Sequence, residues 1–243
     1  MSGTRLAVLL ASLLLVAVTA GAALAGDIVT VPTANQVKAG EMDLATYYIF
    51  VDQDSLIPGL RPPNVPSEVD YIRAQTLYVG LTDKLELDVH RYDVDVAGVT
   101  TIFNATYLLQ PEDAQRPNVV FGARNLSGEG APGSDDVSYF FSAAKTLNPP
   151  VAGPPTGPIF RLHLSLGTED NTLFGEPRHE GLFGGVQIVM RPASPFIGLI
   201  GLYDGQDVIT GVTYVPEPGW PTFKGGTFGG HWWLGASYTF NAK

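Results

Sequence analysis

The sequence predicts an all-β protein folded as a single antiparallel β-barrel of about twelve strands, with about ten strands as the alternative. The main observation is an alternation of apolar and polar residues, in segments of about ten residues that recur to the C-terminus. The 28 glycines and 19 prolines supply turns between these segments. Capped helical periodicity is not found after residue 25. We therefore expect strands joined by turns and loops.

The composition of the 243-residue chain excludes several classes of protein. The chain has no cysteine, which excludes disulfides, cysteine zinc ligands and a cysteine nucleophile. It has 14 Lys and Arg against 24 Asp and Glu residues, a net charge of −10, which argues against a nucleic-acid partner. No linker separates two apolar cores, so residues 26–243 are expected to form one β-barrel domain.

Residues 1–25 are typical of a signal peptide. A single Arg5 precedes an apolar run that starts at Leu6, and Ala23 and Ala25 form an A-x-A cleavage site. An uncleaved membrane anchor is the alternative, because the apolar run is nearly long enough to span a bilayer. No second run of about 18 apolar residues follows. The mature chain is therefore expected either as a membrane barrel or as a soluble protein outside the cytoplasm.

Eleven segments show the alternation expected of strands. The clearest covers residues 160–167, where Phe and Leu residues alternate with Arg161, His163 and Ser165. In chain order the segments are 41–50, 69–82, 84–90, 100–110, 117–126, 136–146, 160–167, 181–191, 195–204, 207–216 and 231–241. Turn-forming residues separate them, as at Asp204-Gly205.

Closure of the barrel adds a constraint on the strand count. Bilayer hydrocarbon cannot pair the N–H and C=O groups of an open edge, so the strands must form a complete ring. Single-chain bacterial barrels have an even number of strands. A twelfth strand is therefore expected at residues 28–33 or within residues 222–229. The alternation after Leu85 changes phase at His90-Arg91, which predicts a β-bulge there.

Alternation alone does not separate a membrane barrel from a soluble sandwich, because the two differ in which face meets water. Export permits a transmembrane β-barrel, and aromatic residues lie near the strand ends, where interfacial girdles belong. These aromatics are Tyr47, Tyr48, Phe50, Tyr71, Tyr92, Tyr203, Tyr214 and Trp220. The deciding geometry is Leu162 and Leu164 directed outward with Arg161 and His163 directed inward.

The last predicted strand carries a pattern related to assembly. Its residues Gly235, Tyr238 and Phe240 resemble the C-terminal β-signal that bacterial outer-membrane proteins present to their assembly machinery. Here Asn241-Ala242-Lys243 follows the final aromatic residue. The resemblance implies an outer-membrane location, contact with outer-membrane lipid, and the assembly machinery as a partner.

A second resemblance lies near the expected mature N-terminus. The stretch Gly26-Asp-Ile-Val-Thr-Val-Pro-Thr-Ala34, followed by Gly40-Glu-Met-Asp-Leu44, resembles the opening segment of YjbH-like outer-membrane proteins. These proteins are associated with exopolysaccharide export. The resemblance covers about twenty residues, and it implies a link to polysaccharide export.

The polar face of the strands gathers charges of both signs. If this face lines the lumen, it forms either a solute-selective lining or a structural network of ion pairs that fills the bore. The candidate lumen-facing residues are Glu41, Asp43, Arg73, Lys84, Glu86, Asp88, His90, Arg124, Arg161, His163 and Arg191. The balance of charge favours the structural network.

No motif for catalysis, a cofactor or a metal is complete, so we expect neither an enzyme nor a cofactor. His163 and Ser165 lie two apart on one strand face and resemble the His-x-Ser dyad of outer-membrane lipid A deacylases, but Leu166 stands where that family has Asn. A lipid hydrolase is therefore a minor alternative. Asp204 and Asp207 are interpreted as solvated loop residues rather than calcium ligands.

The leading hypothesis is an outer-membrane β-barrel that acts as a small porin-like channel or as a structural barrel. A small solute or a polysaccharide is its candidate ligand, and the oligomeric state stays open. The alternative is a soluble exported β-sandwich or a lipocalin-like ligand-binding protein, which would be periplasmic or secreted.

Overall fold

A computed structural model describes seven stretches of the chain. They are residues 31–51, 70–95, 98–128, 136–147, 158–168, 178–191 and 195–241. Residues 1–25, the predicted signal peptide, lie outside them. Within the described stretches the regular structure is β-sheet, as predicted. They contain no helix that is long and apolar enough to cross a bilayer.

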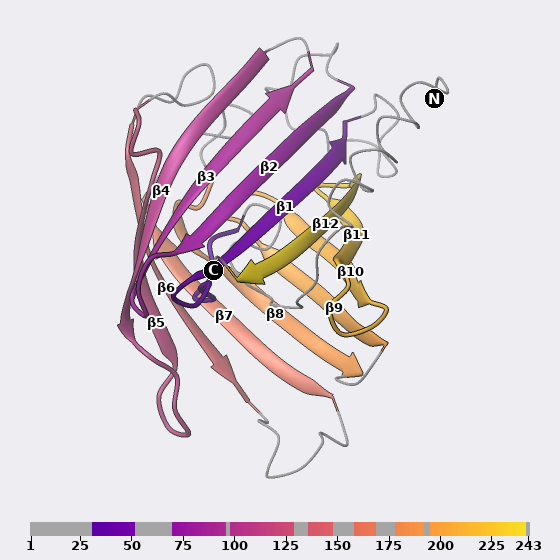
Figure 1. The fold of residues 1–243 in the computed structure, drawn as a ribbon. Helices are drawn as coiled ribbons and strands as arrows, with labels where there is room; N and C mark the ends of the chain where they lie inside the picture. Colours follow the sequence, from indigo (N-terminus) through magenta and orange to yellow (C-terminus); the bar gives the residue numbers. More distant parts are fainter. Residues whose placement is uncertain are drawn as a thin grey trace.

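Twelve strands are present among the described residues, and Figure 1 shows them wrapped around one axis. They are β1 (Glu41–Phe50), β2 (Tyr71–Gly80), β3 (Leu85–Val94), β4 (Gly98–Gln110), β5 (Asn118–Arg124), β6 (Ser138–Thr146), β7 (Ile159–Gly167), β8 (Gly181–Arg191), β9 (Phe196–Tyr203), β10 (Val208–Val215), β11 (Thr222–Phe228) and β12 (His231–Asn241). Of the two segments predicted for the twelfth strand, the one within residues 222–229 is confirmed, because β11 occupies residues 222–228.

The strands form a closed antiparallel ring. Each strand pairs with its neighbours in sequence, and β12 pairs with β1 from Glu41↔Asn241 to Phe50↔Trp232. The first and last strands therefore leave no open edge. The prediction of one closed twelve-stranded barrel is confirmed.

The bulge predicted at His90-Arg91 is wrong. β3 keeps one register with β2 and with β4 along its whole length. Shifts of register occur instead between Leu108 and Gln110, and between Val189 and Arg191. The change of phase in the sequence of β3 has another cause. Partway along this strand the outer face changes from apolar to polar, and the inner face changes from polar to apolar.

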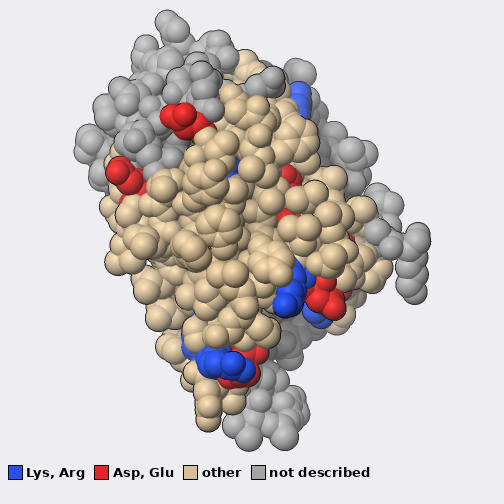
Figure 2. Space-filling model, turned by 90° about the vertical axis from the view of Figure 1, so that its left-hand side faces the viewer, with Lys and Arg blue, Asp and Glu red and all other residues tan. Residues whose placement is uncertain are grey.

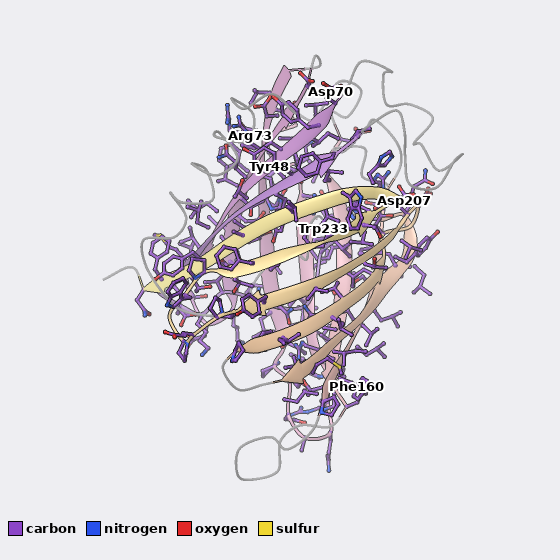
Figure 3. All side chains as sticks on the ribbon, turned by 90° about the vertical axis from the view of Figure 1, so that its right-hand side faces the viewer. Tyr48, Asp70, Arg73, Phe160, Asp207 and Trp233 are labelled. Atoms are coloured by element: carbon purple, nitrogen blue, oxygen red, sulfur yellow. The ribbon has the colours of Figure 1, made fainter. Side chains whose placement is uncertain are left out.

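The barrel has two distinct ends. The end where β1 begins and β12 finishes is called the terminal end, and the opposite end is called the far end. In Figure 3 Phe160, at the start of β7, lies at the terminal end, whereas Tyr48 and Asp70 lie toward the far end. Along each strand, alternate residues point to the lumen and to the outer face.

The outer face of the barrel is predominantly apolar. Leu162 and Leu164 are 47% and 53% exposed, whereas His163 between them is 1% exposed. Other exposed apolar residues belong to this outer belt: Leu44, Leu87, Phe103, Tyr107, Leu109, Tyr139, Phe141, Phe160, Leu166, Leu182, Met190, Leu199, Tyr203, Val208, Val212, Tyr214, Trp232 and Leu234. Figure 2 shows a broad uncharged surface on one side, with charged side chains in separate groups nearer its margins.

The lumen next to the far end is filled mainly by apolar side chains. The Trp233 ring meets Tyr47 edge-on, with ring centroids 6.1 Å apart. Tyr47 lies against Gly235, where an added Cβ would be 2.3 Å from the Tyr47 ring. Tyr47 and Tyr92, expected in an outer girdle, are buried in this core instead. Its other members include Ile49, Val51, Ile72, Ile102, Phe140, Phe183, Leu202, Ile209 and Phe228.

Candidate functional site

The lumen next to the terminal end holds a segment of the chain itself. Residues 31–40 precede β1, and inward-facing side chains of three strands contact them. Ser165 of β7 donates to the Pro32 carbonyl oxygen over 3.5 Å, and Asn118 of β5 donates to the Ala34 carbonyl oxygen. Glu86 of β3 accepts a hydrogen bond of 2.5 Å from the Val37 backbone N–H. This N-terminal segment therefore lies inside the barrel.

The segment reaches the terminal end and turns into β1. The Gly40 backbone N–H donates to the Gly80 carbonyl oxygen over 2.8 Å, and Glu41 donates to the Lys38 carbonyl oxygen over 2.9 Å. Gly40 has a φ of 76°, which favours glycine. A Cβ at Gly80 would lie 2.0 Å from the Lys38 carbonyl oxygen, so the close approach of the segment requires glycine there.

Most of the candidate lumen-facing residues lie on the inner face. Those that are buried there are Asp43, Glu86, Asp88, His90, Arg124 and His163. Glu41 is half-buried and shares the face of Asp43 on β1, and Arg161 contacts the N-terminal segment. Because these residues come from four strands, the ring brings together side chains that are far apart in sequence.

Asp88, His90 and Arg124 belong to one buried polar network. His90 Nε2 lies 2.7 Å from Asp88 Oδ1, and His90 Nδ1 lies 3.1 Å from the Tyr92 hydroxyl. Arg124 Nη2 donates to the same hydroxyl over 3.4 Å, and Asn104 donates to Asp88 Oδ1. Buried polar groups with such partners are retained as a unit, because removing one leaves another uncompensated. The network therefore fixes the arrangement of β3, β4 and β5.

Arg161 joins the N-terminal segment to the barrel rim. Its Nε donates to Asn35 Oδ1 over 2.9 Å, and its Nη1 lies 2.5 Å from Glu112 Oε2 and 2.9 Å from Thr146 Oγ1. Burial alone raises the pKa of Glu112, but hydrogen bonds from the Thr146 backbone and from Arg161 outweigh it and lower that pKa. Glu112 thus binds Arg161 as a carboxylate.

Two of the candidates do not line the lumen. Arg73 is on the face of Leu77 and Val79, and it pairs with Asp93 on the outside of the sheet, toward the far end (Figure 3). Lys84 precedes β3 in an exposed turn. The prediction that Arg73 faces the lumen is wrong because it assumed a polar inner face. Near the far end the inner face of β2 is apolar, as at Ile72, so the polar residue lies outside. The side chain of Arg191 lies outside the described set.

Two inward cations were not among the candidates. Lys224 of β11 is buried, and its Nζ donates to the Tyr47 hydroxyl over 3.1 Å. It also interacts electrostatically with Asp43, which accepts a hydrogen bond from Thr239. The signal was present in the sequence, because Lys224 interrupts the apolar pattern of residues 222–229.

Arg178 closes the far end of the lumen. It is fully buried and pairs with Asp204 at 2.5 Å and with Asp207 at 2.8 Å, while its guanidinium lies 5.2 Å from the centre of the Phe228 ring. Asp204 is also fully buried, so its interpretation as a solvated loop residue is wrong. Arg178 precedes β8 rather than lying in a strand, so strand alternation could not identify it.

The side chains of His163 and Ser165 bond in opposite directions. His163 Nε2 lies 3.0 Å from Gln187 Oε1 on β8, whereas Ser165 Oγ lies 2.7 Å from Ser142 Oγ on β6. A nucleophile requires its base within hydrogen-bond reach. Both side chains instead serve as links between adjacent strands.

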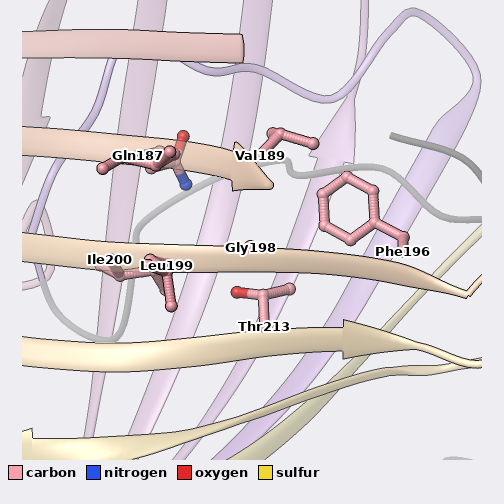
Figure 4. Close-up of a pocket in the computed structure, with 8 residues that line it drawn as sticks. Gln187, Val189, Phe196, Gly198, Leu199, Ile200 and Thr213 are labelled. Atoms are coloured by element: carbon pink, nitrogen blue, oxygen red, sulfur yellow. The ribbon is translucent and has the colours of Figure 1, made fainter. Parts of the chain in front are cut away.

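A small cavity of about 10 Å³ lies beside β8, β9 and β10. Gln187 and Thr213 flank Gly198 there, as Figure 4 shows. This volume is about that needed for one water molecule. Among the described residues, no group of three or more His, Cys, Asp or Glu residues is arranged to hold a metal ion.

Comparison with known proteins adds no family assignment. No family model matches the chain, and no curated protein matches it.

Proposed function

We propose that the protein is an integral outer-membrane β-barrel with a closed lumen, and that it serves as a structural barrel of the envelope rather than as an open porin. The observation that carries the proposal is the outward direction of Leu162 and Leu164 on a closed ring whose inner face holds His163. Such a surface is stable in hydrocarbon, because every strand edge is paired and the polar side chains behind the outer belt are enclosed.

Two seals support a structural role over a channel. Near the terminal end, residues 31–38 occupy the lumen and contact β3, β5 and β7. Near the far end, Trp233 and its neighbours fill the lumen, and Arg178 lies buried against Phe228. A solute would have to displace both groups to pass. The link to polysaccharide export stays a prediction that rests on the sequence resemblance.

Fractionation and gel mobility test the membrane location. We expect the protein to require detergent for extraction and to migrate differently before and after boiling, because a closed barrel resists unfolding in the gel buffer. Recovery of the mature chain as a free periplasmic protein would overturn the proposal and favour the soluble exported alternative.

Planar-bilayer recording tests the closed lumen. The purified barrel should give no steady conductance above the bilayer baseline. A known porin purified in the same way is the positive control and should conduct. Steady conductance of the unmodified protein would contradict the structural role and favour the small channel.

A further inference from the structure

The N-terminal segment is bound in the lumen in the manner of a peptide ligand. The ring of paired strands starts at Glu41, so residues 31–38 contribute no strand to barrel closure. Ser165 and Asn118 donate to the carbonyl oxygens of residues 32 and 34, and Glu86 accepts from the N–H of residue 37. Recognition of main-chain groups is the usual way in which proteins bind extended peptides.

Side-chain contacts add selectivity to this main-chain recognition. Arg161 donates to the Asn35 carboxamide over 2.9 Å, and the Gln36 carboxamide donates to the Thr106 carbonyl oxygen over 3.0 Å. Ala34 is fully buried, in contact with the apolar core of the barrel. A larger side chain at position 34 would have to displace its neighbours.

We propose that the lumen next to the terminal end is a binding site for an extended peptide, and that residues 31–38 are its ligand in cis. The ligand class is an extended peptide in which a small residue is followed by two carboxamide side chains and then by a residue whose backbone N–H donates to Glu86. Glu86, Asn118, Arg161 and Ser165 are the binding residues. The inference does not rest on the outer-membrane location, since it concerns the inside of the barrel.

A cysteine reporter tests whether the segment is held by these contacts. The chain has no cysteine, so Thr33→Cys introduces a single thiol at a buried position of the full-length protein. In detergent, the rate of its modification by a maleimide should rise about tenfold when Asn118→Ala and Arg161→Ala are added, because two polar contacts are lost. Arg116→Ala, at an exposed arginine near the same end, is the matched control and should leave the rate unchanged.

The expected result requires that the boiled and unboiled forms still migrate differently, which shows that the barrel is intact. Equal modification rates in the parent and in the Asn118→Ala/Arg161→Ala protein would overturn the proposal. So would rapid modification in the parent, because the segment would then not occupy the site.

A peptide added in trans tests the ligand class. Val37→Pro in the full-length chain removes the N–H that donates to Glu86 and weakens the cis ligand. A fluorescent peptide of residues 26–39 should bind this variant at least about tenfold more tightly than it binds the parent protein, where the tethered segment competes. The same peptide carrying Ala34→Leu should bind about tenfold more weakly to the variant.

Equal binding of the two peptides would contradict a specific site, and no binding of either peptide would contradict an exchangeable one. Each outcome is read in detergent, independently of cell fractionation. Failure of this inference is therefore distinguishable from failure of the proposed membrane location.

Discussion

The two halves of the lumen are built on opposite principles. Near the terminal end the inner face is polar, and Asp43, Glu86 and His163 are buried beneath an apolar outer belt. Near the far end the inner face is mainly apolar, with Trp233 and Tyr47 in a packed core and the buried Arg178–Asp204 ion pair at its edge. The first half follows the arrangement of a membrane barrel, whereas the second is filled like the core of a soluble β-protein.

The outer face of β2 and β3 changes in the same place. Leu87 and Val89 face outward on β3 near the terminal end, whereas Arg91 and Asp93 face outward further along it. Arg91 Nη1 donates to Gln75 over 2.9 Å on the same outer surface. The outer face of β3 thus changes from apolar to polar without a change of register, whereas its inner face changes from polar to apolar.

The largest expected difference between the two faces is at adjacent tryptophans of β12. Trp233→Ala should lower the free energy of unfolding by about 3–5 kcal/mol, because it leaves a cavity in the far-end core. Trp232→Ala is the matched control, since Trp232 is 54% exposed on the outer belt. The measurement is the temperature at which half of the protein shifts from the folded to the unfolded gel band. Equal losses of stability for the two variants would mean that the packing of Trp233 in the far-end core does not stabilise the barrel more than an exposed tryptophan does.

A charge placed on the outer face should separate the apolar belt from the polar far-end surface. Leu164→Arg should cost about 2–4 kcal/mol in lipid, the usual cost of arginine near the bilayer midplane of a barrel. Val99→Arg is the control, because Val99 is equally exposed but lies opposite Asp93 at the far end. The fraction of folded protein after insertion into lipid vesicles measures the difference. If Leu164→Arg folds as well as Val99→Arg, lipid does not surround the belt.

A glycine substitution tests how tightly the far-end core is packed. Gly235→Ala should destabilise the barrel by about 1–3 kcal/mol, because the new Cβ would meet Tyr47 and the Thr46 carbonyl oxygen. Gly201→Ala is the control, since the nearest atom to its Cβ would be 4.0 Å away. Thermal unfolding in detergent compares the two. A neutral Gly235→Ala would show that Tyr47 does not need this glycine.

The same comparison explains what could be predicted from the sequence. Alternation located nearly every strand, and residues 160–167 also predicted which face is apolar, because that face is uniform along β7. It failed at Arg73 and at His90-Arg91, where the two faces exchange character within a strand and a change of environment resembles a bulge.

The contents of the lumen could be predicted only in part. Most of the predicted polar residues do face inward. Alternate residues of a strand point to opposite faces, so a charged residue between two outward leucines points into the lumen. The N-terminal segment could not be located, because its contacts are to Glu86, Asn118 and Arg161, which are far away in sequence and come together only when the ring closes. Arg178 was missed for a related reason, since a buried cation outside a strand has no periodic signal.

The smallest expected effect is a pH dependence at the terminal end, where the carboxylate of Glu112 binds Arg161. The pKa of Glu112 is lower in the folded protein than its ordinary value of 4.5. A carboxyl group with a lowered folded pKa contributes stability that is fully present above its unfolded pKa and is lost as the pH falls through the folded pKa. The barrel should therefore lose stability on acidification below about pH 4.5.

Glu112→Gln should remove this part of the acid dependence, because the amide does not titrate and still accepts a hydrogen bond from Arg161. Trp233→Ala should leave the dependence unchanged, since the far-end core around Trp233 is apolar. Thermal unfolding midpoints at pH 6 and at about pH 3.5, compared between the parent and each variant, give the measurement. A parent and a Glu112→Gln protein with the same acid dependence would place the titrating groups away from the Arg161 contact, and the two halves of the lumen would then not differ in their response to pH.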